Sequence, residues 1–128
     1  EAIFELNVLG QPAVVAISEH ALMQILRNIM SNGIRYNQLQ PTLKTTIDYR
    51  NLAVTVTIQD NGIGIAQQHL PHIFDRFYRI DEARTNEISG TGLGLSITKM
   101  LVEKYDSQLN VESSLNKGTV FILDFPKK

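Results

Sequence analysis

Five of the eight glycines in the sequence lie within or beside one segment of about 30 residues, Asp60 to Thr91, that has neither helical nor strand periodicity. They are the glycines at positions 62, 64, 90, 92 and 94. Structureless segments of this length are uncommon inside a compact domain, and they usually carry function. The regular elements of the fold must therefore lie on either side of a long, glycine-rich connection.

Two segments have the apolar spacing of an amphipathic helix. The first follows Ser18, a residue type favoured at a helix N-cap, and ends near Tyr36–Asn37. The second is expected over Leu93–Tyr105. The residues predicted to face the core are Leu22, Ile25, Leu26, Ile29 and Met30 in the first helix and Leu93, Ile97, Met100 and Leu101 in the second.

Strand patterns account for most of the remaining chain. They cover Ile3–Val8, Ala13–Ile17, Leu43–Tyr49, Leu52–Ile58, Leu109–Val111 and Thr119–Phe125. Arg50-Asn51 predicts one hairpin turn and Asn116-Lys117-Gly118 predicts another. The order strands, helix, hairpin, loop, helix, hairpin predicts an α+β two-layer sandwich, with helices on one face of a mixed, mostly antiparallel sheet.

Composition excludes several classes of protein. With 12 basic and 13 acidic residues, bulk charge does not favour nucleic acid or an anionic membrane. The absence of cysteine excludes disulfides and thiolate metal sites, and no apolar run is long enough to span a membrane. Residues 1–128 are expected to form a single domain, and a chain that starts at Glu1 is expected to be a piece of a longer protein.

Asn28 and Asn32 lie four residues apart, so both carboxamides project from one face of the first predicted helix. Asparagine oxygens suit a hard cation such as Mg²⁺, which takes few protein ligands and adds phosphate oxygens and water. Arg35, close by on the same helix, can meet phosphate. A polar stripe facing solvent would give the same pattern.

The sequence Asp60-Asn61-Gly62-Ile63-Gly64-Ile65 directly follows a β-branched strand. A carboxylate at a strand end can accept a hydrogen bond from an exocyclic amine, and the two glycines allow backbone to approach a flat ligand. A tight turn is the competing interpretation, because Asp-Asn-Gly is a strong turn signal.

The sequence Gly90-Thr91-Gly92-Leu93-Gly94-Leu95 opens the second predicted helix. Backbone N–H groups at a glycine-rich helix start, together with the helix dipole, form a site for phosphate. The spacing matches neither the dinucleotide-binding G-x-G-x-x-G nor a P-loop. A flexible hinge is the alternative interpretation.

The sequence Ile73-Phe74-Asp75-Arg76-Phe77-Tyr78-Arg79 has two phenylalanines three residues apart, which predicts an apolar anchor on one helical turn. Arg79 and Arg84 lie in a polar segment where they can contact phosphate, although solvated arginines are common. Three histidines have no metal-ligand spacing and are interpreted as structural or surface residues: His20, His69 and His72.

The order and spacing of these four motifs resemble those of the catalytic ATP-binding domain of bacterial sensor histidine kinases, over nearly the whole chain. LRNIMSNGIRYN resembles the asparagine box of that family, DNGIGI its first glycine box, IFDRFYR its phenylalanine box and GTGLGL its second glycine box. GTVFILDFP matches its last strand. The superfamily includes gyrase and the mismatch-repair ATPases, and the resemblance implies its Bergerat-type ATP-binding fold.

The resemblance also implies a site for ATP and Mg²⁺. Asn32 would be the main magnesium ligand, with Asn28 beside it. Asp60 would accept a hydrogen bond from the adenine amino group, with Thr119 helping through water. Phe74 and Phe77 would anchor a lid over Tyr78–Gly90. Arg84 would share a catalytic role with the two asparagines, and Phe77 would also contact the nucleotide. The other residues implied to contact or shape the nucleotide site are Arg35, Tyr36, Gly62, Gly64, Ile65, Arg79, Gly90, Thr91, Gly92, Leu93, Gly94 and Leu95.

The implied activity is transfer of the γ-phosphate of ATP to a histidine on a separate dimerisation and phosphoacceptor domain that this sequence lacks. A response regulator is the implied downstream partner. The 128-residue chain is expected to bind ATP without phosphorylating itself, to be monomeric, and to belong to the cytoplasmic part of a membrane-anchored homodimer. The alternatives are a superfamily ATPase, a protein-serine kinase of the anti-sigma-factor type, and a nucleotide-binding interaction module. Asn28 stands where the ATPases have a glutamate general base, which favours a kinase.

Three positions depart from the family pattern. Gly33 replaces the usual alanine, Ala83 replaces a common serine, and Tyr105-Asp106-Ser107 replaces His-Gly-Gly after the second helix. The last change leaves the geometry of that turn open.

Overall fold

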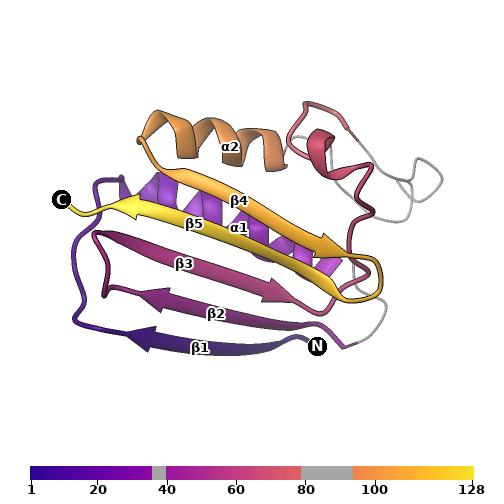
Figure 1. The fold of residues 1–128 in the computed structure, drawn as a ribbon, viewed down its shortest axis with the longest axis horizontal. Helices are drawn as coiled ribbons and strands as arrows, with labels where there is room; N and C mark the ends of the chain where they lie inside the picture. The colour runs from indigo at the N-terminus through magenta and orange to yellow at the C-terminus, as the bar shows by residue number, and fades with distance from the viewer. Residues whose placement is uncertain (36–39, 79–93) are drawn as a thin grey trace.

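The computed structural model describes residues 1–35, 40–78 and 94–128. Within these ranges lie five strands, two α-helices and one 3₁₀ turn (Figure 1). In chain order they are β1 (Ile3–Leu9), α1 (Glu19–Arg35), β2 (Thr42–Asp48), β3 (Ala53–Asp60), η1 (Leu70–His72), α2 (Gly94–Lys104), β4 (Gln108–Ser114) and β5 (Gly118–Pro126).

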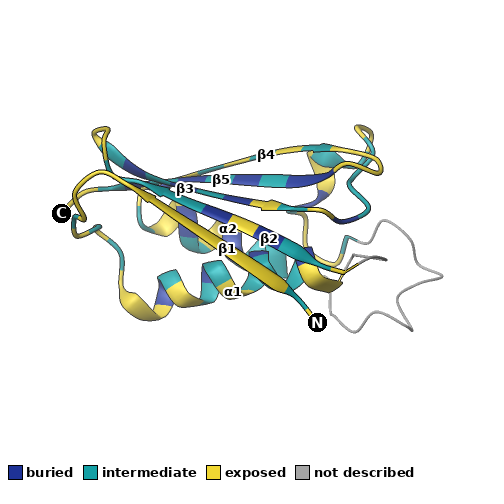
Figure 2. Cartoon of the chain, turned by 90° about the horizontal axis from the view of Figure 1, so that it is seen from below, coloured by how far each residue is buried: buried dark blue, intermediate teal, exposed yellow. Residues whose placement is uncertain are grey.

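The five strands form one mixed sheet in the order β1-β2-β3-β5-β4. β1 and β2 are parallel, and the other three neighbouring pairs are antiparallel. Both α-helices lie on the same face of the sheet, as the view from its side shows (Figure 2). The predicted α+β sandwich with a mostly antiparallel sheet is therefore confirmed. No helix among the described residues is both long and apolar enough to cross a membrane.

The core lies between this sheet face and the helices. Alternate residues of β3 and β5 point into it, which is why their sequences alternate in hydrophobicity. Helix α1 contributes Ile25 and Ile29, four residues apart on one face, and α2 contributes Val102. The buried strand residues are Val54, Val56 and Ile58 of β3 and Phe121, Leu123 and Phe125 of β5.

Helix α1 begins where the sequence predicts. The Oγ of Ser18 accepts a hydrogen bond from the N–H of Ala21 at 3.2 Å, the geometry of an N-cap. The helix extends to Arg35, and the predicted end at Tyr36–Asn37 falls outside the described residues.

The prediction of a strand at Ala13–Ile17 is wrong. Only Val15 forms a bridge, with Lys127, supported by the hydrogen bond from Ala16 N–H to the Pro126 carbonyl at 2.9 Å. The reason is steric: β3 and β4 already flank β5, and β4 leaves the β5 edge open only beyond Asp124. The apolar segment before α1 therefore forms one bridge and no ladder.

The β2–β3 turn is longer than predicted. It spans Tyr49–Leu52 instead of Arg50-Asn51 alone, and Leu52 is 96% exposed. Asp48 organises the turn by accepting hydrogen bonds from the N–H of Arg50 at 3.0 Å and from its guanidinium at 2.9 Å. These bonds lower the pKa of the Asp48 carboxyl to about 2. The pair of Asp48 and Arg50 thus sets the length of the turn. The alternation of apolar residues in the sequence does not predict this pair.

The buried face of α2 differs from the predicted one. Met100 is 59% exposed, whereas Thr98 and Val102 are buried. Ile97 is half-buried and Leu101 packs beside the core, while Leu93 lies outside the described residues. The core-facing stripe contains a threonine, which a search for apolar residues passes over.

The turn after α2 keeps a standard helix end without glycine. Asp106 adopts a left-handed conformation with φ 56°. Its N–H bonds to the Glu103 carbonyl at 3.2 Å, and the N–H of Ser107 bonds to the Val102 carbonyl at 2.9 Å. This pair of bonds is the Schellman motif. The Tyr105 hydroxyl also donates to the Ser18 Oγ at 3.2 Å, which connects this turn to the N-cap of α1.

Candidate functional site

Asp60 is the last residue of β3, at the end of the sheet where the β4–β5 hairpin turn also lies (Figure 1). Its Oδ1 accepts hydrogen bonds from the N–H of Gly62 at 2.8 Å and from the N–H of Thr119 at 3.1 Å. Burial raises the pKa of the Asp60 carboxyl, and these two bonds counter the rise in part. Two backbone groups therefore fix the carboxyl group in place, and no described residue donates a hydrogen bond to its Oδ2.

Thr119 and Ser113 lie beside Asp60, paired across β4 and β5. Their hydroxyl oxygens are 2.8 Å apart. The Ser113 Oγ also donates to the Gly118 carbonyl at 2.9 Å and accepts from the N–H of Ile65 at 2.7 Å. Together with Gly62 these residues form one connected set, which we call the Asp60 network: Asp60, Gly62, Ile65, Ser113 and Thr119.

Glycines in and around this network are required by close backbone contacts. Gly64 has φ 77°, and a Cβ there would fall on the Ser114 carbonyl. Gly118 has φ 91°, and a Cβ there would fall on the Asp60 carbonyl. At Gly33 of α1, a Cβ would lie 2.6 Å from the Leu43 Cδ2 and 3.0 Å from the Asp60 Cβ. Glycine at position 33 therefore lets the end of α1 pack directly on Asp60.

Asn28 connects α1 to the start of α2. Its Nδ2 donates to the Gly94 carbonyl and to the Thr98 Oγ1, both at 3.2 Å, and Thr98 donates to the same carbonyl at 2.8 Å. Because a carbonyl oxygen only accepts, the Asn28 atom facing Gly94 must be the amide nitrogen. No described residue donates a hydrogen bond to the Asn28 side-chain oxygen.

The donor chemistry of α1 fits magnesium. Asn32 lies one turn beyond Asn28 and is half-buried, and Arg35 is exposed at the last position of the helix. Amide oxygens with phosphate and water are a ligand set that Mg²⁺ accepts. Among the described residues no cluster of three histidines or carboxylates offers a competing metal site.

The two phenylalanines of the predicted apolar anchor behave differently. Phe74 packs against the core, and the Lys99 ammonium lies 5.8 Å from its ring centre. Phe77 is 62% exposed and has φ 64°, so the prediction is confirmed for Phe74 and wrong for Phe77. A left-handed backbone turns the second ring away from the core, which spacing along a regular turn does not anticipate.

Two histidines surround Tyr78. The Nδ1 of His69 is 2.5 Å from the Tyr78 hydroxyl, and the ring of His72 stacks on Tyr78 at 5.3 Å. His72 also pairs with Asp75 at 3.1 Å. These histidines have structural partners, as the sequence interpretation expects.

Several predicted site residues lie outside the described part of the chain. They are Tyr36, Arg79, Arg84, Gly90, Thr91, Gly92 and Leu93. Of the second glycine motif, the described residues are Gly94, the first residue of α2, and Leu95, which packs against the core.

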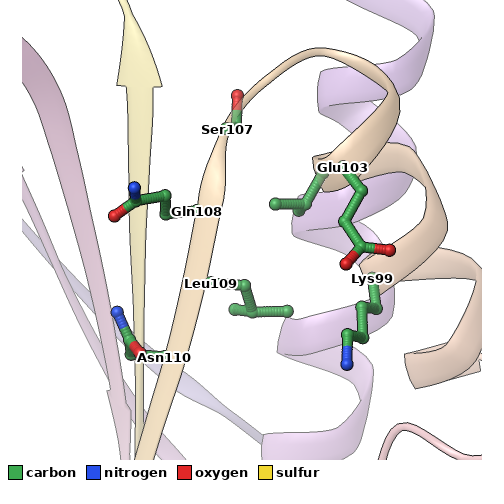
Figure 3. Close-up of a pocket in the computed structure, with 7 residues that line it drawn as sticks. Lys99, Glu103, Ser107, Gln108, Leu109 and Asn110 are labelled. Carbon is green, nitrogen blue, oxygen red and sulfur yellow. The ribbon is translucent and has the colours of Figure 1, made fainter.

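A cavity of about 270 Å³ lies elsewhere, between α2 and the beginning of β4 (Figure 3). Its walls include Lys99, Glu103, Gln108 and Asn110. Gln108 pairs with Asp124, far along β5 from the Thr119 that contacts Asp60. The cavity is therefore separate from the Asp60 network.

Three residues near the site were not singled out from the sequence: Ser113, Thr98 and Gly33 as a contact of Asp60. Strand register brings Ser113 opposite Thr119, and helix packing brings Thr98 opposite Asn28. The available signals are a polar residue on an otherwise apolar face for Thr98 and a helical glycine for Gly33.

Comparison with known proteins gives the family. Residues 17–128 match the family described as histidine kinase-, DNA gyrase B-, and HSP90-like ATPase. The sensor protein SrrB of Staphylococcus aureus is 43% identical over 104 residues, which cover 81% of this chain and 18% of that protein. The chain thus spans under a fifth of the length of this curated relative.

Solved structures share the fold. The catalytic domain of histidine kinase ThkA, in a nucleotide-free form, has a TM-score of 0.81 at 26% identity, covering 98% of this chain and 79% of that one. The mycobacterial sensor histidine kinase MprB has a TM-score of 0.83 at 24% identity, covering 99% and 83%. Full-length ShkA in complex with AMPPNP has a TM-score of 0.83 at 23% identity, covering 99% of this chain and 26% of that one. The chain belongs to the histidine kinase-, DNA gyrase B- and HSP90-like ATPase family and is similar to a sensor protein and to a histidine kinase catalytic domain.

Proposed function

We propose that this domain binds Mg-ATP at the Asp60 end of the sheet and presents the γ-phosphate to a histidine of another domain. The observation that carries the proposal is the Asp60 carboxyl, whose Oδ1 is held by the N–H groups of Gly62 and Thr119 while no described residue donates to its Oδ2. A single fixed acceptor of this kind suits the adenine amino group. The ShkA structure, which shares the fold, holds AMPPNP.

The asparagines supply the second half of the proposed site. The Asn28 carboxamide, oriented by the bond from its nitrogen to the Gly94 carbonyl, and the Asn32 carboxamide would hold Mg²⁺ through their oxygens. The metal, when bound, would neutralise charge on the phosphates. Arg35 would contact phosphate from the end of α1. Tyr36, Arg79, Arg84 and the residues Gly90–Leu95 remain proposed nucleotide contacts, as do Gly62, Gly64, Ile65 and Phe77.

The proposed reaction is phosphoryl transfer. The bond between the γ-phosphorus and its bridging oxygen breaks, a bond to a histidine nitrogen forms, and ADP leaves. The chain's own groups position the nucleotide and do no covalent chemistry. Asn28 has no basic group, so it cannot take a proton from water as a glutamate would. This residue favours transfer over hydrolysis by a superfamily ATPase.

The proposed partners follow from the proposed phosphoryl transfer. The acceptor histidine would belong to an upstream dimerisation domain of the same membrane-anchored homodimeric protein, and a response regulator would receive the phosphoryl group. Residues 1–128 would act as one monomeric domain in the cytoplasm, without contact to membrane or nucleic acid.

Two measurements test this function. Titration calorimetry should show ATP binding that depends on Mg²⁺ and weakens at least about tenfold in Asn32→Ala, because a metal ligand is lost. Incubation with γ-labelled ATP should leave the chain unlabelled. Stoichiometric label on His20, His69 or His72, or rapid release of phosphate, would contradict transfer to a separate domain.

A further inference from the structure

The Ser113 hydroxyl uses every hydrogen-bonding position it has. A serine hydroxyl has one hydrogen to donate and two lone pairs that accept. Its oxygen lies 2.7 Å from the Ile65 nitrogen, 2.9 Å from the Gly118 carbonyl oxygen and 2.8 Å from the Thr119 hydroxyl oxygen. Three neighbours therefore match three positions.

The roles of two neighbours determine the role of the third. The Ile65 N–H can only donate and the Gly118 carbonyl can only accept, so the single Ser113 hydrogen points to Gly118. Thr119 must then donate its own hydrogen to Ser113. The Thr119 oxygen is left with lone pairs alone on its remaining side.

The neighbouring carboxylate has the same polarity. The Asp60 Oδ1 accepts from the N–H groups of Gly62 and Thr119. No described residue donates a hydrogen bond to its Oδ2. Asp60 as a carboxylate and Thr119 together therefore present acceptors, and no side-chain donor, to whatever binds between them.

We propose that Ser113 is a positioning residue for base selection: by taking the Thr119 hydrogen, it makes this end of the site accept from the amino group of adenine and reject the carbonyl oxygen of guanine. The two bases differ there because adenine carries an N6 amino donor where guanine carries an O6 acceptor. Ser113 acts through Thr119 and Ile65 and need not touch the nucleotide. This inference rests on the proposed binding of ATP.

The test compares the dissociation constants for Mg-ATP and Mg-GTP, measured by titration calorimetry, in the parent chain and in Ser113→Ala. The parent should prefer ATP. In Ser113→Ala the Thr119 hydrogen is released and can donate to guanine O6, so the preference for ATP over GTP should fall about tenfold, the worth of one hydrogen bond. Ser114→Ala, the same change at the exposed neighbouring residue, should leave the preference unchanged.

A matched pair of variants covers the case in which Ser113→Ala fails to fold. Ser113→Thr keeps the hydroxyl. Ser113→Val introduces a side chain of nearly the same shape as threonine but without the hydroxyl. The threonine variant should keep the preference and the valine variant should lose it.

The outcomes separate this inference from the proposed function. A parent chain that binds neither nucleotide overturns both. A parent that binds ATP and GTP equally well overturns the role of Ser113 alone. If Ser113→Ala weakens the binding of ATP and of GTP equally, or if Ser113→Val leaves the preference unchanged, Ser113 has a purely structural role. Either result also overturns its role in base selection.

Discussion

Gly64 and Phe77 share a left-handed backbone but lie in regions held together in different ways. Gly64, with φ 77°, lies beside the Asp60 network, where the Asp60 side chain at the end of β3 accepts from the N–H of Thr119 in β5, far along the chain. Phe77, with φ 64°, lies in the segment Leu70–Tyr78, where the hydrogen bonds between described residues are local, such as Tyr78 N–H to the Asp75 carbonyl at 3.3 Å and the contact of His69 with Tyr78. The Asp60 network thus joins residues far apart in the sequence, whereas the second segment is held by bonds between near neighbours, which open at lower free energy.

The largest effect is expected from Gly64→Ala. The new Cβ would fall on the Ser114 carbonyl in a left-handed backbone, so the free energy of unfolding should drop by at least about 3 kcal/mol. Urea denaturation measures it. Gly94→Ala is the matched control, because a Cβ built there meets no atom within 4 Å beyond its chain neighbours and its own helix backbone, and alanine favours helix. Equal stability of the two variants would show that the backbone around Gly64 yields easily.

Asp60→Asn should separate binding from stability. The carboxamide oxygen can still accept from Gly62 and Thr119, but its nitrogen cannot accept from an amine, so ATP should bind at least about tenfold more weakly. Burial raises the pKa of Asp60 in the folded chain, so the parent loses stability as pH rises from the ordinary aspartate pKa through the raised one. The variant should therefore gain on the parent over that range and remain at least as stable at pH 7.

Asp48→Asn provides the control of opposite sign. Hydrogen bonds from Arg50 lower the pKa of Asp48 to about 2, so its contribution to stability is present above the ordinary aspartate pKa and is lost as pH falls toward 2. Thermal melts from pH 3 to 8 compare the two variants. Parallel pH curves for both would show that burial of Asp60 does not govern its ionisation.

The exposed left-handed phenylalanine offers a stabilising change. Phe77→Gly should be more stable than Phe77→Ala by about 1 kcal/mol, because both remove the ring and only glycine relieves the left-handed strain. Chemical denaturation of the pair isolates the backbone effect from the contact between Arg76 and the ring. If the alanine variant is the more stable, the segment relaxes to an ordinary conformation at no cost.

Asp106 is intermediate between Gly64 and Phe77. It has a left-handed conformation and a backbone hydrogen bond, but it is not a glycine. Asp106→Gly should raise the free energy of unfolding by about 0.5 kcal/mol, because relief of strain slightly exceeds the entropy that glycine costs. Asp106→Ala should lower it instead. A loss of stability with glycine would mean that the Asp106 side chain contributes more than its backbone conformation costs.

The sequence predicted the parts of the fold that follow from periodicity. The alternation in Val54, Val56 and Ile58 and the spacing of Ile25 and Ile29 reflect burial on one face, and those elements are where they were expected. The segment Ala13–Ile17 forms only the bridge from Val15 to Lys127, at the end of the β5 side that β4 leaves uncovered, so its apolar run does not become a strand. Availability of an edge is a property of the whole sheet and is not encoded locally.

The candidate site divides in the same way. Asp60 and the glycines around it stand out because one short motif contains them. Ser113 does not, since its meaning comes from lying opposite Thr119 in the β4–β5 register and beside Ile65. The exposure of Phe77 depends on one backbone angle, which residue spacing does not determine.

β1 has a consequence for the order in which the sheet opens. Every residue of β1 is exposed, including Phe4 and Leu6, and its ladder partner is β2 on one side only. β5, by contrast, is buried at alternate positions between two neighbours. Amide hydrogen exchange should therefore be graded across the sheet, fastest in β1 and slowest in β5, because local opening of β1 gives up little buried surface. The parallel strand can thus detach while the Asp60 network, which joins the end of β3 to β5 and β4, stays intact.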